Sequence, residues 1–221
     1  MMCLPLKAGT IIGHVHAEGK AGTDDNNAAS AGEYSNRKYE FVQKVDYADM
    51  HDFVVFIEGP VATNSMPSTN IVSVTTQRVV QHGAMFTPHI LPIMVGTTVE
   101  WPNNDDIYHN VFSSSDAKQF DLGLYKGNPE DKRVTFDKTG RVDVFCSIHQ
   151  NMHCIILVLD NPYYSSTDDD GNYKIPNVPP GIYKLKAWQE RLPSDEKEIT
   201  VTTNGEVRVD FTLGIKNLPQ Y

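Results

Sequence analysis

Four side chains with sulfur or nitrogen donor atoms indicate a metal site in the middle of the chain. Cys146, His149 and Met152 follow one another with two residues between each pair, and His109 stands at an upstream junction between a loop and a strand. A thiolate, two imidazoles and a weakly bound thioether are the ligands of a blue-copper site. Three strong donors in one plane suit both Cu(I) and Cu(II), so we predict one mononuclear copper site that exchanges single electrons.

The spacing of these residues is consistent with one ion held by a short loop and a distant strand. A Cys-x-x-His-x-x-Met loop can curl around an ion, but four adjacent ligands cannot all point inward, so His109 supplies the fourth. Asn110 is expected to hydrogen-bond to the loop of Cys146 and support the thiolate. His153 directly follows Met152, so the sequence leaves the axial position open between these two residues.

Other chemistries fit the same residues less well. Attachment of c-type haem needs two cysteines before the histidine, and a structural zinc site usually uses two or more paired cysteines. A disulfide between Cys146 and Cys154 is conceivable, as is a nucleophilic thiol with His149 as its base. The nucleophile lacks recognisable oxyanion donors. Cys146 alone would indicate only a buried free thiol, but the donors around it favour copper.

The rest of the sequence predicts an all-β fold, because apolar and polar residues alternate in short runs between turn residues. No segment carries the start and stop signals of a helix. The continuous apolar run from Cys154 to Leu159 predicts a strand that is buried on both faces. Residues 18–38 are small and polar, so we expect a mobile insertion between strands there. Many short strands with dense turn signals are typical of a sandwich or barrel.

Composition narrows the possible partners of the chain. Its 221 residues include 19 Lys and Arg against 28 Asp and Glu, a net charge of −9. This charge disfavours nucleic acid, which needs a concentrated positive surface, and suits basic protein partners. No apolar run approaches the roughly 20 residues of a membrane helix, so an integral membrane protein is not expected. No signal peptide is visible, and three cysteines exclude a disulfide-rich scaffold.

Residues 70–160 resemble a cupredoxin of the plastocyanin and amicyanin type, most closely the methylamine-utilization type. The likeness is carried by Val99-Glu-Trp-Pro-Asn-Asn-Asp, His109-Asn-Val-Phe-Ser, Phe120-Asp-Leu-Gly-Leu-Tyr, Val134-Thr-Phe-Asp-Lys-Thr-Gly and Val144-Phe-Cys-Ser-Ile-His. It implies a Greek-key β-sandwich or barrel with one type 1 copper ion, whose ligands are His109, Cys146, His149 and Met152. It also implies a non-enzymatic electron carrier in which the edge of His149 is the exit for electrons.

The flanking segments resemble a carboxypeptidase-regulatory-like, transthyretin-like β-sandwich. The similar segments are Gly9–His16, Phe53–Gly59, Thr167–Tyr173, Gly181–Leu185 and Val207–Leu213. We therefore expect opening strands of this sandwich in 8–62, the copper domain in 70–160 and the closing part in 161–215. The resemblance implies a non-catalytic scaffold or docking role for this second, discontinuous domain.

The expected function is transfer of electrons between redox proteins, such as c-type cytochromes or an oxidoreductase, in the periplasm or another extracytoplasmic space. An apolar patch of Met85, Phe86 and Pro88 near the copper would suit brief docking. One alternative is a nitrite-reductase-like copper enzyme with a further site built from histidines, and another is a copper storage or delivery module. His14 and His16 share one face of a strand, which indicates either a second metal site or a partly exposed surface. His51, His82 and His89 are interpreted as isolated structural residues.

Overall fold

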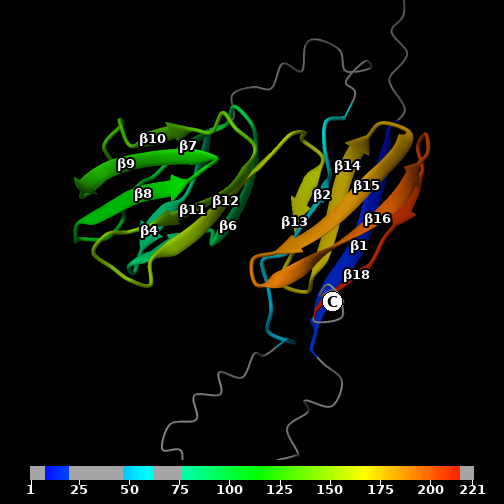
Figure 1. Cartoon of the computed structure of the whole chain (residues 1–221), viewed down its shortest axis with the longest axis horizontal. Coiled ribbons are helices and arrows are strands. Elements are labelled where there is room, and N and C mark those ends of the chain that lie inside the picture. Colours follow the sequence, from blue (N-terminus) through cyan, green and yellow to red (C-terminus); the bar gives the residue numbers. More distant parts are fainter. Residues whose placement is uncertain (1–7, 20–46, 62–75, 215–221) are drawn as a thin grey trace, which may run out of the picture.

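The structure, a computed structural model, describes residues 8–19, 47–61 and 76–214. Within those ranges every regular element is a strand, which confirms the all-β prediction. Nothing in this part of the chain forms a helix of the length and apolarity needed to cross a membrane. The strands form two lobes that pack side by side (Figure 1). Most of the predicted insertion at 18–38, and the start of the 70–160 segment, lie outside the described residues.

The first lobe is a sandwich whose sheets have the strand orders β6-β12-β11-β8-β9 and β10-β7-β3, with β4 and β5 as a separate hairpin. Trp101 and Phe136 lie fully buried at the centre of its core, which both sheets share. The strands of this lobe are β3 (Thr76–Arg78), β4 (Val80–His82), β5 (Met85–Thr87), β6 (Ile90–Met94), β7 (Thr98–Glu100), β8 (His109–Ser115), β9 (Lys118–Tyr125), β10 (Arg133–Thr135), β11 (Gly140–Phe145) and β12 (His153–Leu159).

The second lobe joins the two ends of the described chain. One sheet has the order β14-β1-β17, with β18 also paired to β1, and the other has the order β13-β2-β15-β16. The long strand β1 pairs in parallel with β17 along its first half and with β18 along its second half. The strands are β1 (Gly9–Glu18), β2 (Val54–Ile57), β13 (Tyr164–Ser166), β14 (Asn172–Val178), β15 (Gly181–Gln189), β16 (Leu192–Val201), β17 (Glu206–Arg208) and β18 (Phe211–Gly214).

Strand β12 connects the lobes because its two faces belong to two different cores. Successive side chains of a strand point to opposite faces. Cys154, Ile156 and Val158 enter the core of the first lobe. Ile155, Leu157 and Leu159 enter a smaller apolar cluster with Val54 of β2 and, at its edge, Trp188 of β15. The prediction of a strand buried on both faces is thus confirmed, and the second face is covered by the neighbouring lobe.

Candidate metal centre

The hairpin between β11 and β12 forms one side of the candidate site. Cys146 directly follows β11 and Met152 directly precedes β12, in two strands that pair antiparallel. The main-chain N–H of Cys146 donates to the carbonyl of Met152 at 3.2 Å, and that of Met152 donates to the carbonyl of His149 at 3.1 Å. These bonds close the loop on itself, so its side chains are held by the sheet from which it projects.

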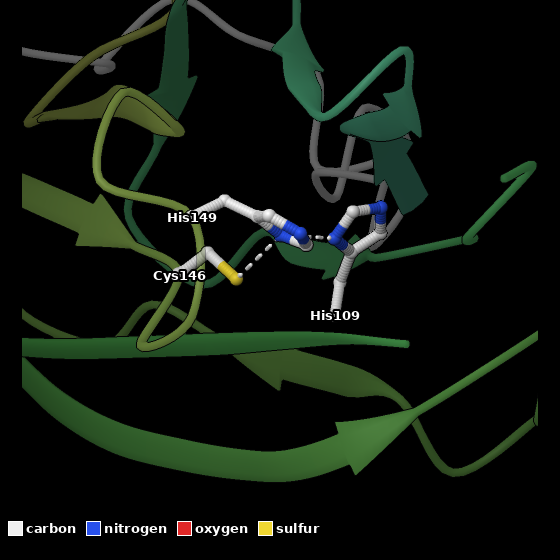
Figure 2. Close-up of side chains that lie close together, drawn as sticks. All are labelled: His109, Cys146 and His149. Carbon is white, nitrogen blue, oxygen red and sulfur yellow. Dashed lines mark hydrogen bonds between the residues drawn. The ribbon is translucent and has the colours of Figure 1, made fainter. Parts of the chain in front are cut away.

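The donor atoms of three side chains converge at this loop. One donor atom each of His109, Cys146 and His149 lies within 4.8 Å of the others. His109 Nδ1 lies 2.9 Å from His149 Nδ1, and Cys146 Sγ lies 3.6 Å from the same nitrogen. Figure 2 shows Cys146 and His149 pointing from the loop toward His109, which comes from the start of β8. His109 and Cys146 are buried and His149 is half-buried, so only one ligand edge approaches solvent.

Asp105 fixes the orientation of His109. The carboxylate oxygen Oδ2 of Asp105 lies 2.8 Å from His109 Nε2 and accepts the N–H of Ala84 at 2.9 Å. Its other oxygen, Oδ1, accepts the N–H of Gly83 at 2.7 Å. The N–H of Ala84 is the main cause that lowers the pKa of Asp105 to about 2, with further help from His109 and Gly83 and against the effect of burial. A carboxylate can only accept, so we assign the proton of His109 to Nε2, and Nδ1 presents a lone pair to the site.

Asp105 is a residue of the site that the sequence pattern does not predict. It stands four residues before His109, a spacing that signals proximity in a helix and carries no such signal in a loop. The loop is shaped by the buried Asn103, whose Oδ1 accepts the N–H of Asp105 at 2.9 Å. Asn103 Nδ2 donates to the carbonyls of Ile107 at 2.9 Å and Tyr125 at 3.2 Å. The position of Asp105 therefore depends on tertiary contacts rather than on local pattern.

Asn110 supports the thiol as expected, through its main chain. Its N–H donates to Cys146 Sγ at 3.4 Å, and its side-chain Nδ2 donates to Asp121 Oδ1 at 2.6 Å. The N–H of Gly123 and this amide together lower the pKa of Asp121. An N–H directed at a ligand sulfur withdraws electron density from it, which is one of the means by which proteins tune the potential of copper sites.

The fold separates Met152 from His153. Met152 is 1% exposed and belongs to the same buried cluster as Cys146. The ring of His153 turns the other way: its Nε2 lies 3.0 Å from Asp143 Oδ1, and it stacks on Phe145 with ring centroids 4.7 Å apart. Met152 therefore lies on the side of Cys146, and His153 takes part in a different group of side chains.

The residues fit a copper ion. A soft sulfur and two imidazole nitrogens approach one point from two separate elements, and Asp105 orients the ring of His109 through Nε2 so that Nδ1 faces this point. This donor set is the one that copper prefers. Cys146 and Cys154 are free thiols, and burial raises the pKa of Cys154, so Cys154 is an inert core residue. The conceivable disulfide between them is not formed.

All three histidines interpreted as isolated have charged neighbours. His82 Nδ1 lies 3.4 Å from Asp105 Oδ1, and His51 Nε2 lies 3.2 Å from Asp49 Oδ1. His89 contacts Glu190 and His153, so the interpretation as isolated residues is wrong for all three. His14 and His16 lie 5.6 Å apart between ring centroids on one face of β1. They form no group of three metal-ligating side chains in the part of the chain that the structure describes.

Comparisons with known proteins match two segments of the chain to protein families. Residues 74–159 match the family of copper binding proteins, plastocyanin/azurin family, and residues 156–214 match the carboxypeptidase regulatory-like domain. A search of the curated proteins gives no match.

Similar solved structures include a copper-containing nitrite reductase from Thermus scotoductus SA-01. It has 28% identity over 47% of this chain and 26% of its own, with a TM-score of 0.36. A purple cupredoxin from Nitrosopumilus maritimus has 26% identity over 37% of this chain and 98% of its own, with a TM-score of 0.32. An oxidized amicyanin mutant has 22% identity over 40% of this chain and 87% of its own, with a TM-score of 0.34. The chain spans about a quarter of the length of the nitrite reductase. By its two family matches, the chain combines a copper-binding domain of the plastocyanin/azurin family with a carboxypeptidase regulatory-like domain.

Proposed function

We propose that the chain is a type 1 copper electron-transfer protein whose ligands are His109, Cys146 and His149, with Met152 as the weak axial ligand. The observation that carries this proposal is the convergence of the three donor atoms, with the ring of His109 oriented by Asp105. Copper bound there supplies one-electron chemistry between Cu(I) and Cu(II).

The surrounding residues favour small rearrangement on electron transfer. The ligand loop is closed by its own main-chain hydrogen bonds, and β8, which begins with His109, pairs with β11, which ends before Cys146. Burial of His109 and Cys146 excludes water from most of the site. A site fixed by its scaffold in one geometry costs little reorganisation when the charge of the ion changes.

Exposed apolar side chains beside the ligands support docking of a partner. Met85 is 61% exposed in the β4–β5 hairpin and Ile148 is 50% exposed in the ligand loop. Ile107, Tyr108 and Leu124, on segments adjoining His109, are exposed as well. These five are most of the exposed large apolar side chains of the described residues, and their position favours a docking face near His149. Phe86, which the sequence analysis placed in this patch, is buried against Trp101.

The net charge of −9 favours a partner with a basic contact surface and an association rate that falls with salt. The proposed partners are c-type cytochromes or an oxidoreductase with a surface redox centre, and the proposed location is the periplasm or another extracytoplasmic space. Stopped-flow kinetics test the proposed partners. They measure the rate of electron transfer from a reduced c-type cytochrome to the copper-loaded chain at increasing salt concentration. Ile148→Lys is expected to slow the transfer, whereas Ile182→Lys, at an exposed site of the second lobe, is the matched control.

Visible absorption and electron paramagnetic resonance after addition of Cu(II) test the site itself. We expect an intense sulfur-to-copper charge-transfer band that disappears in Cys146→Ser. Met152→Ala should shift the reduction potential and His153→Ala should leave it nearly unchanged, because only Met152 lies on the side of Cys146. A colourless copper-loaded chain, or a band that survives in Cys146→Ser, would overturn the proposal.

A further inference from the structure

A second group of potential metal ligands lies where the two lobes meet. His89 stands just before β6 and His153 begins β12, whereas Glu190 comes from the turn between β15 and β16 of the second lobe. One donor atom from each of the three lies within 4.8 Å of the others, and all three residues are half-buried. None of them belongs to the proposed copper site.

The hydrogen bonds of His89 leave one ring nitrogen facing a carboxylate. Nδ1 lies 3.2 Å from the main-chain oxygen of His153, which can only accept, so this nitrogen carries a proton. Nε2 lies 2.9 Å from Glu190 Oε1, which in the ionised state is also only an acceptor. Two acceptors do not attract each other, so either a proton, on the ring or on the carboxyl group, or a metal ion must lie between these two atoms.

His153 has one ring nitrogen on a carboxylate outside the group and leaves the other without a hydrogen bond to the described residues. Its Nε2 lies 3.0 Å from Asp143 Oδ1, and its Nδ1 makes no hydrogen bond with any residue in the described ranges. Arg141 holds Asp143 with two contacts of 2.9 and 2.7 Å. Although burial opposes it, hydrogen bonding to Arg141 and His153 keeps the pKa of Asp143 below its usual value. Metal-binding histidines typically donate one ring N–H to a carboxylate or carbonyl and keep the other nitrogen for the ion.

From this geometry we propose that His89, His153 and Glu190 form a binding site for a divalent first-row transition-metal ion at the junction of the two lobes. Two imidazoles and one carboxylate are a donor set suited to Zn²⁺ and its neighbours in the series, whereas Mg²⁺ and Ca²⁺ prefer oxygen donors alone. Glu190 and Asp143 are acidic, and apart from the two histidines Arg141 is the one basic side chain that hydrogen-bonds to either of them among the described residues. With both imidazole rings neutral, the group carries a net negative charge that favours a cation.

The ion would connect the copper domain with the carboxypeptidase regulatory-like domain. Two of its ligands come from the first domain and the third from the second, next to the apolar cluster that contains Ile155 and Trp188. This proposal does not depend on the assignment of the copper site.

Zinc binding to the copper-loaded full chain tests the proposal. Isothermal titration with Zn²⁺, checked by equilibrium dialysis and elemental analysis, is expected to give one Zn²⁺ per chain. His89→Gln and Glu190→Gln should each weaken this binding by about tenfold or more. His51→Gln is the matched control, because His51 also contacts a carboxylate, Asp49 at 3.2 Å, but belongs to no group of three metal-ligating side chains among the described residues. The His51→Gln variant should bind Zn²⁺ like the wild type.

Circular dichroism and thermal unfolding verify that each variant is folded before its affinity is compared. Absence of Zn²⁺ binding to the copper-loaded chain, or binding that neither Glu190→Gln nor His89→Gln weakens, would overturn the proposal and leave the group as an ion pair between lobes. If the chain takes up no copper, the same titration on the metal-free protein still reports this site. In that titration, the junction site is identified as the Zn²⁺ binding that is lost in Glu190→Gln and retained in His51→Gln.

Discussion

Replacement of Asp105 by asparagine should weaken copper binding although Asp105 is not a ligand. The carboxylate accepts three N–H groups, from His109 at 2.8 Å, Gly83 at 2.7 Å and Ala84 at 2.9 Å. The amide has one acceptor oxygen and an NH₂ group that would face donors, so the ring of His109 loses its fixed proton position. Loss of such an outer partner typically costs about 10- to 100-fold in metal affinity, which corresponds to about 1.4 to 2.8 kcal/mol.

A competition titration against a chelator of known Cu(II) affinity measures this loss. The charge-transfer band should persist in Asp105→Asn, because the thiolate of Cys146 is untouched, while the resonance parameters change with the orientation of His109. Asp106→Asn is the matched control: Asp106 is the next residue, 99% exposed, and pairs with Lys126 at 2.6 Å. If Asp105→Asn binds copper within about twofold of the wild type, the orienting role assigned to Asp105 is refuted.

Three further predictions concern stability. Ile155→Ala should lower the free energy of unfolding in urea by about 2–5 kcal/mol, because Ile155 is fully buried between the lobes. Ile182→Ala, at a position 68% exposed, should change the free energy of unfolding by less than about 0.5 kcal/mol. Equal effects of the two substitutions would contradict the burial of Ile155 between the lobes. Asn161→Ala should cost about 2–4 kcal/mol in thermal unfolding, because its buried side chain satisfies two carbonyls and one main-chain N–H; an unchanged midpoint would exclude this role. Burial raises the pKa of Tyr173, so the folded state holds a proton that the unfolded chain releases above its ordinary pKa of about 10. Stability should therefore fall as the pH rises above that value, and less steeply in Tyr173→Phe; identical pH profiles for the two proteins would contradict this.

Strand patterns and the ligand loop were accessible from the sequence because their signals are local. The apolar run from Cys154 to Leu159 predicts burial on both faces, and the structure supplies a separate core for each face. The spacing of Cys146, His149 and Met152 in one hairpin likewise depends on residues that are close in the chain. His109 could be added since a loop of this length cannot provide every ligand.

The outer partners of the site were not accessible in this way. Asp105 contacts His109 only because Asn103 and the β4–β5 hairpin shape the intervening loop. His89 and Glu190 are 101 residues apart in sequence and belong to different lobes. Their proximity follows from the packing of one domain on the other, for which neither local spacing nor composition carries a signal.

The pairing of β1 and β2 has a consequence for biosynthesis. Both strands leave the ribosome before the copper domain, yet β1 pairs with β14, β17 and β18, and β2 with β13 and β15. Every one of these partners follows the strands of the copper domain in the order of translation. Domains tend to fold as units as they emerge, so the copper domain can complete its sandwich during synthesis. Until β13 to β18 have been synthesised, the two early strands remain unpaired and accessible to chaperones.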